Sequence, residues 1–318
     1  MSTTIEKPIA LRDEDVVGVF SPSDALSGNR QDRVRSGCDR LSQAGFQTLL
    51  SPNVFAKDGT MAGSIKQRIS DISLLLADPK IKAMFPTWGG KACNQLIYDL
   101  PYREILQTKK IWLGFGDIAV LLNAITAKTG LITFYGPNIV GKLDETDHWA
   151  LRLVREPVID PGSNILANAT KGEYKCLRPG IARGRLFGGN LNCFVLGVAC
   201  AKIDLGVFDG GIFFWEDLGL TPRQVDQHLT ALRNSGLLDR ISGMVVGDFI
   251  AREAENRETS NPFDSVLHPS RDYKFPILYA PVFGHRRLEN PIFPIGAMCE
   301  LDAEASTLVM LERCVVRR

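Results

Sequence analysis

The strongest constraint on the fold of this 318-residue chain is an alternation of apolar runs and helical-period segments over residues 15–155. Gly, Pro and Ser turns separate these segments. The predicted strands are 16–20, 46–50, 81–90 and 109–115, and the predicted helices are 29–44, 64–78, 91–100 and 117–128. Strands that alternate with helices in this way predict a parallel, doubly wound sheet, an α/β fold.

Two of the predicted helices carry signals at their ends. Pro79 ends the helix over 64–78, because proline lacks the N–H that the next turn needs. The apolar stripe of this helix is predicted to comprise Ile65, Ile69, Ile72 and Leu76. At the start of the helix over 117–128, the carboxylate of Asp117 is predicted to cap the first backbone N–H groups.

The chain changes character between residues 161 and 179, which are rich in Gly, Asn and Pro and show no clear period. We predict a linker there. After it come mostly short strands with two helices, one over 190–201 and one over 222–235. The predicted organisation is an N-terminal domain over residues 1–160, the linker over 161–179, and a smaller α+β domain over 180–318.

Composition is that of an ordinary globular protein, with 45% hydrophobic and 23% charged residues. The net charge of +1 gives no field that would attract nucleic acid or an acidic membrane, so we expect neither partner. The longest apolar runs, 118–127 and 193–201, are about half of a membrane span. The first residues show no basic segment followed by an apolar core, so no secretory signal is predicted.

The seven cysteines contain no CxxC pair, and most lie in apolar surroundings. This pattern favours free thiols in a reducing cytoplasm. It does not favour a structural zinc site, which needs ligands at paired spacing. We therefore expect a cytoplasmic protein without a metal site.

Turns follow three predicted strands of the first half, at 21–23, Gly89-Gly90 and 114–117, and the last two of them contain glycine. The carboxyl ends of parallel strands are where such sheets bind ligands. Backbone N–H groups exposed at these turns stabilise anions, including the oxyanion of a tetrahedral intermediate. Taken one at a time, however, Gly pairs after strands are more often plain turns.

Two titratable residues end strands of the second half. Glu216 closes an apolar run, and His285 follows Gly284 after another. A carboxylate beside an imidazole orients and charges it, and the imidazole moves protons near neutral pH. The alternative is a capping glutamate and a surface histidine. The other histidines, His148, His228 and His268, have weaker contexts and receive no role.

Eight segments, in order along nearly the whole chain, resemble the LD-carboxypeptidase family of serine peptidases, which includes the microcin C immunity hydrolases. The resemblance implies a flavodoxin-like N-terminal domain, a small β-rich C-terminal domain and a site between them. It also implies a Ser-His-Glu triad, a cytoplasmic homodimer, no metal or cofactor, and a small peptide-like or peptidyl-nucleotide ligand. The segments are VGVFSPSD, ADPKIKAMFPTWGG, IWLGFGDIAVLLNAI, FYGPNI, RGRLFGGNLN, FFWEDLGLTPRQVDQHLTALRNSG, VVGDF and FGHRRLENPIFPIG.

The same resemblance assigns roles position by position. The triad glutamate and histidine fall on Glu216 and His285, and the oxyanion donors fall on Gly89-Gly90 and the amide of Asp117. The serine of the family's Gly-aromatic-Ser-Asp motif falls on Gly116, so the attacking hydroxyl is replaced by hydrogen. Trp88 also stands where the family often has an arginine before the Gly pair.

Glycine at the nucleophile position is compatible with the fold, because it tolerates the strained backbone of such an elbow without a Cβ penalty. It removes the acyl-enzyme route altogether. Other hydroxyls or thiols near the predicted turns are Ser21, Ser23 and Cys93, the last at a helix start where a thiol's pKa can fall. None of them has a base placed beside it by the sequence.

Three accounts of Gly116 remain open. The chain could be a hydrolase variant made inactive to trap its substrate, or a natural relative that binds a peptide-like ligand without cutting it. In the third account Glu216 and His285 activate a water or shift protons on another substrate, as an acid/base biosynthetic enzyme would. A serine-bearing form would cut beside the carboxyl-terminal residue of a murein-like peptide or a peptidyl-nucleotide.

Overall fold

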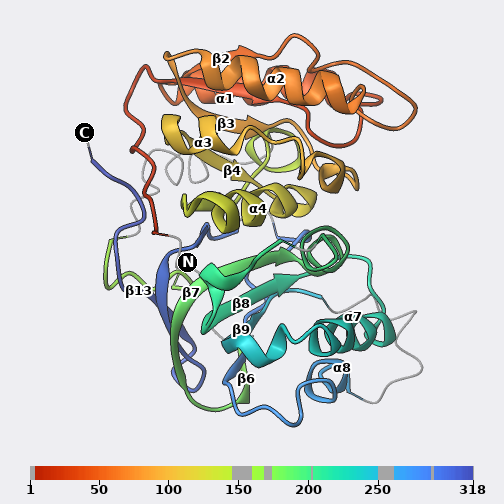
Figure 1. Cartoon of the computed structure of the whole chain (residues 1–318), viewed down its shortest axis with the longest axis vertical. Helices are drawn as coiled ribbons and strands as arrows, with labels where there is room; N and C mark the ends of the chain where they lie inside the picture. The colour runs from red at the N-terminus through yellow and green to blue at the C-terminus, as the bar shows by residue number, and fades with distance from the viewer. Residues whose placement is uncertain are drawn as a thin grey trace.

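The computed structural model describes residues 4–144, 160–167, 174–201, 203–249, 261–287 and 290–317. These residues form two β-sheets, drawn one above the other in Figure 1, with helix α4 (Ala119–Thr129) between them. One continuous apolar core runs through both halves of the chain.

The first sheet has the strand order β11-β5-β4-β3-β1-β2. Its first five strands in the sequence are parallel, in the order 2-1-3-4-5 that is typical of flavodoxin-like folds. The predicted α/β class and the flavodoxin-like arrangement are thus confirmed. The strands are β1 (Val16–Phe20), β2 (Gln47–Leu50), β3 (Ile81–Pro86), β4 (Ile111–Gly114) and β5 (Thr133–Tyr135).

Helices α1 (Arg30–Gln43) and α2 (Ile65–Ala77) lie where the sequence predicts them. Helix α2 begins with a capping box, in which Ser64 and Gln67 satisfy each other's backbone N–H groups. The predicted apolar stripe is wrong at Ile65, which is 40% exposed. Arg68 lies on the buried face instead, because its guanidinium donates to the carbonyl of Pro22 and to the Gln95 side chain.

Between β3 and β4 the prediction is only partly right. The segment 91–100 forms a 3₁₀ turn over Cys93–Leu96 rather than a helix, and α3 (Tyr102–Thr108) follows it without having been predicted. Seven residues are too few to show a helical period clearly, which is the physical reason for the omission.

The second sheet has the order β13-β12-β7-β8-β9-β10-β6. Its four strands β7 to β10 are parallel; β6 and β12 pair antiparallel with β10 and β7, and β13 pairs antiparallel with β12. The strands are β6 (Lys175–Arg178), β7 (Ile181–Asn190), β8 (Gly211–Glu216), β9 (Ile241–Val246), β10 (Ile277–Tyr279), β12 (Met298–Asp302) and β13 (Thr307–Met310).

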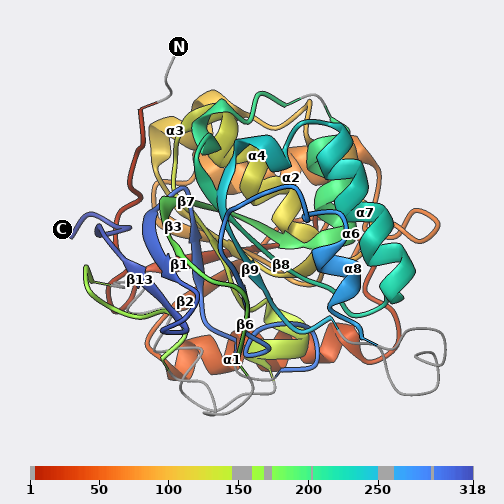
Figure 2. The same ribbon diagram turned by 90° about the horizontal axis from the view of Figure 1, so that it is seen from below.

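Both predicted helices of the second half are present. The first consists of α6 (Leu191–Cys193) and a π-helical turn over Phe194–Ala199, and the second is α7 (Pro222–Asn234). The short helix α8 (Asp264–Leu267) packs beside α7 at one edge of the second sheet (Figure 2).

The chain returns to the first sheet near its end. Strand β11 (Phe293–Ile295) pairs antiparallel with β5. Isolated bridges join Glu6 to Leu131, two residues before β5, and Ile9 to Val316, so the two ends of the described chain pair with each other. The division of the chain at residues 160–180 stays a prediction, and β11 is a segment of the second half that belongs to the first sheet.

Helix α4 is apolar on nearly every side, because it contacts strands of both sheets. Its one buried asparagine, Asn123, donates to the carbonyl of Gly188 at 2.7 Å and accepts from the Gly188 N–H at 3.1 Å. Gly188 lies in β7 of the second sheet. The Asn123 side chain therefore joins helix α4 to the second sheet at Gly188, two residues before the end of β7.

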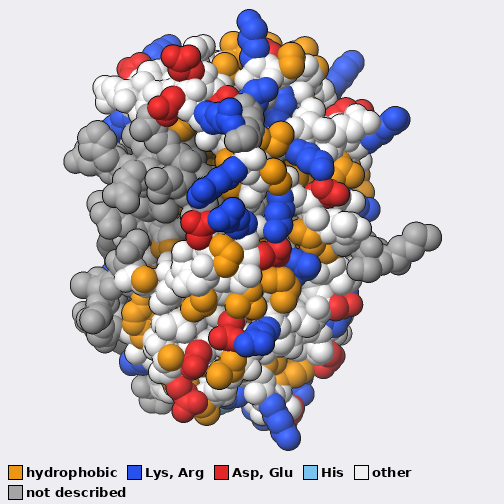
Figure 3. All heavy atoms as spheres, turned by 90° about the vertical axis from the view of Figure 1, so that its left-hand side faces the viewer, with side chains coloured by type: hydrophobic (Ala, Val, Ile, Leu, Met, Phe, Trp, Pro, Cys, Tyr) orange, Lys and Arg blue, Asp and Glu red, His pale blue; other side chains and the backbone are white. Residues whose placement is uncertain are grey.

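No helix in the described ranges is long and apolar enough to cross a membrane. On the face shown in Figure 3, basic and acidic side chains are interspersed, in agreement with the net charge of +1.

We predict that Asn123→Leu lowers the free energy of unfolding by about 2–3 kcal/mol, because the buried N–H and C=O of Gly188 lose their partner. Urea denaturation measures the change. The control is Thr129→Val in the same helix, whose hydroxyl donates to the Ile125 carbonyl one turn earlier. A loss no larger than that of the control would mean that the Asn123 contact does not hold the layers together.

Candidate functional site

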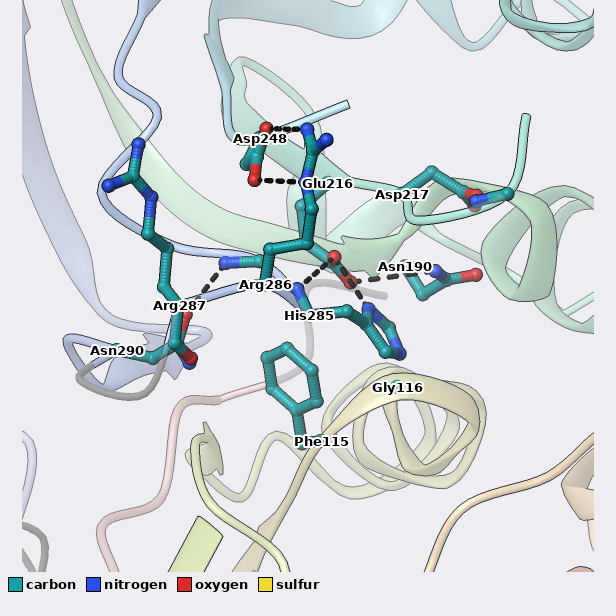
Figure 4. Close-up of polar contacts among 12 residues, drawn as sticks. Phe115, Gly116, Asn190, Glu216, Asp217, Asp248, His285, Arg286, Arg287 and Asn290 are labelled. Carbon is teal, nitrogen blue, oxygen red and sulfur yellow. Dashed lines mark hydrogen bonds and ion pairs between the residues drawn. The ribbon is translucent and has the colours of Figure 1, made fainter. Parts of the chain in front are cut away.

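The turn after β4 carries Gly116, the residue onto which the resemblance would place the family's serine. Gly116 has φ +66°, the left-handed region that favours glycine. A Cβ built on it would lie 3.4 Å from Nε2 of His285, and Figure 4 shows the imidazole directly over this residue. The turn is fixed by Asn138, whose side chain accepts from the Phe115 N–H at 2.8 Å.

Glu216, at the end of β8, is fully buried and hydrogen-bonded to His285. Its Oε2 lies 2.8 Å from the ring Nδ1 of His285 and accepts from the His285 backbone N–H at 3.2 Å. The other oxygen accepts from the hydroxyl of Tyr135 at 2.8 Å and from the Asn190 amide at 3.5 Å. Because Nδ1 donates to the carboxylate, Nε2 is the ring nitrogen directed toward Gly116.

Burial alone would raise the pKa of Glu216, but the imidazole of His285 and the donors around the carboxylate lower the pKa below its ordinary value. A carboxylate with this environment stays charged at neutral pH. It can therefore orient the imidazole and stabilise the imidazolium that forms when His285 takes a proton.

The loop that carries His285 is held from both sides (Figure 4). The Gly284 N–H donates to the Asn290 side chain at 2.6 Å, and Arg286 forms an ion pair with Asp248 in which Nε lies 2.8 Å from Oδ2. The ring of Phe115 packs on the imidazole with centroids 4.8 Å apart. The histidine is thus a fixed part of the site rather than a mobile surface residue.

The predicted capping role of Asp117 is wrong. Its carboxylate turns away from α4 and accepts from Ser23 Oγ at 2.6 Å and from the N–H groups of Ala92 and Cys93, both at 2.9 Å. The helix start has no side-chain cap. Asp117 is buried, and a buried carboxylate needs several donors, which the neighbouring turns supply and the short 3₁₀ turn at its own position does not.

The Gly89-Gly90 turn lies against the elbow. A Cβ on Gly89 would be 3.6 Å from the Asp117 nitrogen, so the two backbones face each other across a narrow gap. Gly90 has φ +149°, and a Cβ there would collide with Asp24 at 2.2 Å. Only glycine fits this position, and Gly89, Gly90 and Asp117, the residues of the predicted anion site, line one cavity.

The alternative nucleophiles are not arranged for attack. The hydroxyl of Ser21 donates to the Val54 carbonyl, and that of Ser23 donates to Asp117. Burial and the nearby carboxylate of Asp117 raise the pKa of Cys93 well above its ordinary value, so the expectation of a lowered thiol pKa is wrong.

One cavity of about 480 Å³ is lined by every predicted site residue except Glu216, which is fully buried and contacts the cavity residue His285. Trp88 forms part of its wall, with the guanidinium of Arg30 4.8 Å from the ring centroid. The lining residues are Trp88, Gly89, Gly90, Lys91, Phe115, Gly116, Asp117, Asn138, Val140, Gly141, Asn190, Asn192, Cys193, Asp217, Leu218, Gly219, Leu220, Gln224 and His285.

Sequence reasoning missed several contributors to this site. Asn190 ends β7 beside Glu216, a strand-end position that the rule used for Glu216 could have found. Tyr135 lies on a strand of three residues with no periodic signal. His228, to which no role was given, lies 3.0 Å from the side chain of Asn192 on the cavity wall. His148 lies outside the described residues.

We predict that Asp117→Ala lowers the free energy of unfolding by about 3 kcal/mol, since it leaves buried donors without an acceptor. Hydrogen exchange should become faster at the amides of Ala92 and Cys93 and stay unchanged in α4. Asp117→Asn keeps one acceptor oxygen, so its free energy of unfolding should lie between those of the parent and of Asp117→Ala. Faster exchange confined to the first turn of α4 would instead restore the capping role.

We also predict a pH-dependent contribution from Glu216. Its pKa is lowered on folding, so the carboxylate stabilises the fold above the unfolded value of about 4.3, and this contribution is lost as the pH falls through the folded pKa. Glu216→Gln should therefore be clearly less stable than the parent at pH 7, and the difference should shrink toward pH 3. A difference independent of pH would contradict a charged carboxylate.

Comparison with known proteins assigns a family to this fold and site. The family model described as the LD-carboxypeptidase N-terminal domain matches residues 17–136, and the C-terminal domain model matches residues 183–301. A putative carboxypeptidase of Synechocystis is 30% identical, over 96% of this chain and 97% of its own. A probable murein peptide carboxypeptidase of Bacillus subtilis is 28% identical, over 96% and 94%.

Solved structures agree on the fold. The microcin C7 self-immunity protein MccF bound to aspartyl sulfamoyl adenosine superposes with a TM-score of 0.84 at 24% identity, covering 98% of this chain and 100% of the other. MccF of Escherichia coli is also 27% identical in sequence, over 73% of this chain and 75% of its own. The chain belongs to the LD-carboxypeptidase family.

Proposed function

We propose that this protein hydrolyses the amide bond beside the carboxyl-terminal residue of a small peptide-like or peptidyl-nucleotide ligand, with a water in place of the family's serine hydroxyl. The observation that carries the proposal is the position of His285 Nε2, 3.4 Å from where a Gly116 Cβ would stand, with Glu216 on the far side of the ring. The imidazole is thus placed to act on an oxygen that lies above a residue without a side chain.

In the proposed reaction His285 takes a proton from the water as its oxygen bonds to the carbonyl carbon of the ligand. The carbonyl oxygen becomes an oxyanion, which the amides of the Gly89-Gly90 turn and of Asp117 stabilise. The bond from carbon to nitrogen then breaks, and His285 returns its proton to the leaving nitrogen. The products are a carboxylic acid and an amine, and no bond to the protein is formed.

This route is slower than a covalent one. In a serine protease without its nucleophile, binding and the oxyanion site alone leave about 10³–10⁴-fold catalysis over water. We therefore expect weak turnover that depends on His285. A cavity of about 480 Å³ is in the range of small-molecule sites and suits a ligand of a few residues.

Names of relatives support the ligand class. One relative is a probable murein peptide carboxypeptidase, and MccF structures hold aspartyl sulfamoyl adenosine, glutamyl sulfamoyl guanosine or adenosine monophosphate. With the family resemblance we further propose a cytoplasmic homodimer that is divided into domains near residues 160–180.

A second candidate is a protein that binds and sequesters such ligands without cutting them, and the absence of a side chain at Gly116 favours it. A third, an acid/base biosynthetic enzyme, would use the Glu216–His285 pair on another substrate. Turnover separates these three: hydrolysis supports the first, tight binding without products supports the second, and a different His285-dependent product supports the third.

We predict slow release of the terminal amine from murein-type peptides with L–D bonds or from an aminoacyl sulfamoyl nucleotide. His285→Ala should abolish it, and intact mass spectrometry should find no covalent adduct during turnover. Gly116→Ser should raise the rate at least about 100-fold and form an acyl intermediate that hydroxylamine traps, because the general base is in place.

Gly116→Ala is the matched control, since it adds the strain of a Cβ at positive φ without a hydroxyl. Its rate should be equal to that of the parent or lower. A folded Ser variant that is inert on every amide tested would contradict a hydrolytic site, whatever the parent does.

A further inference from the structure

Tyr135 lies at the centre of the site without bordering its cavity. It ends β5, is 1% exposed, and stacks on Phe115 with ring centroids 4.8 Å apart and planes at 29°. The Phe214 ring, from β8 of the second sheet, packs on it at 5.6 Å. The phenol is thereby fixed between the two sheets.

The hydroxyl of Tyr135 contacts both parts of the candidate site. It accepts from the backbone N–H of Gly116 at 3.2 Å and donates to Oε1 of Glu216 at 2.8 Å. A phenol hydroxyl donates one hydrogen bond through its proton and accepts others through its lone pairs. The contact to Glu216 uses the proton and the contact to Gly116 uses a lone pair, so the two do not compete. One oxygen atom therefore joins the elbow of the first sheet to the carboxylate of the second.

We infer that Tyr135 is a positioning residue, which sets the elbow at Gly116 against the Glu216–His285 pair through this shared hydroxyl. The inference rests on the proposed function for its catalytic meaning, while the contact itself is independent of any reaction. The elbow and the pair come from different sheets, and an error of about 1 Å between reacting groups can cost about 100-fold in rate.

The glycine makes such an anchor necessary. Glycine populates both signs of φ about equally, so the backbone at Gly116 is not held by its own sterics. Asn138 fixes the preceding residue by accepting from the Phe115 N–H, and Tyr135 fixes the N–H of Gly116 itself. Glu216 is oriented in the same way: His285 occupies one oxygen, and Tyr135 and Asn190 occupy the other.

The test is Tyr135→Phe, which keeps the ring and its stacking and removes only the hydroxyl. Tyr102→Phe is the matched control: its hydroxyl donates to the Ile97 carbonyl at 2.6 Å, and it does not border the cavity. Both variants should fold, and Tyr135→Phe should lose more thermal stability, because it leaves the Gly116 N–H and the buried Glu216 each short of a partner. Only Tyr135→Phe should lower kcat, about ten-fold, with KM within about two-fold of the parent.

A pH profile gives a readout that a merely structural role would not move. Loss of the donor removes one of the contacts that lower the pKa of Glu216, so the acidic limb of kcat should move to higher pH. The other charged groups near the carboxylate are Asp217 on the same strand end and the Asp248–Arg286 pair, and the variant leaves them in place.

NMR separates failure of this inference from failure of the proposed function. In the parent chain the Gly116 amide and the His285 ring proton that bridges to Glu216 should each give a resonance, which Gly116→Ala and His285→Gln assign. Both should shift in Tyr135→Phe and stay in place in Tyr102→Phe. Shifted resonances without any turnover by the parent would support the positioning role and reject hydrolysis.

Unchanged resonances in a folded Tyr135→Phe variant would overturn the inference. So would a kcat and an acidic limb equal to those of Tyr102→Phe in a parent that does turn over its substrate.

Discussion

The arrangement of this site depends on one buried carboxylate. Glu216 is fully enclosed and charged, and such a group is tolerated only when donors surround it. Its donors come from three separate parts of the chain: Tyr135 on the first sheet, Asn190 at the end of β7, and the loop of His285. Satisfying the charge therefore brings the two sheets and this loop into a fixed relation.

A second buried carboxylate does the same for the other wall of the cavity. Asp117 collects the hydroxyl of Ser23 and the amides of Ala92 and Cys93, and so ties the turns after β1 and β3 to the elbow after β4. The two carboxylates have different roles because they have different partners. Glu216 orients the imidazole of His285, whereas Asp117 holds the amides of Ala92 and Cys93, directly after the cavity residue Lys91.

The sequence predicts the elements that have a regular apolar period and the residues that directly follow apolar strands. The sequence indicates Glu216, His285 and the Gly pair as candidates because parallel strands direct their carboxyl ends to one edge of a sheet. The role of Asp117 was missed because its partners lie 94, 25 and 24 residues away, and no local pattern distinguishes a cap from such a contact. Tyr135 was missed because a strand of three residues carries no period.

The elbow at Gly116, where the resemblance places the family's serine, keeps its geometry without a side chain at that residue. The contacts that fix it are made by its backbone: Asn138 holds the Phe115 N–H, and the Tyr135 hydroxyl receives the Gly116 N–H. Neither contact uses a side chain at residue 116, so a hydroxyl there contributes to chemistry and not to architecture. A serine at φ +66° would add backbone strain of roughly 1–2 kcal/mol. The glycine form is thus the less strained one, and its scaffold keeps the imidazole directed at the position from which a hydroxyl would attack.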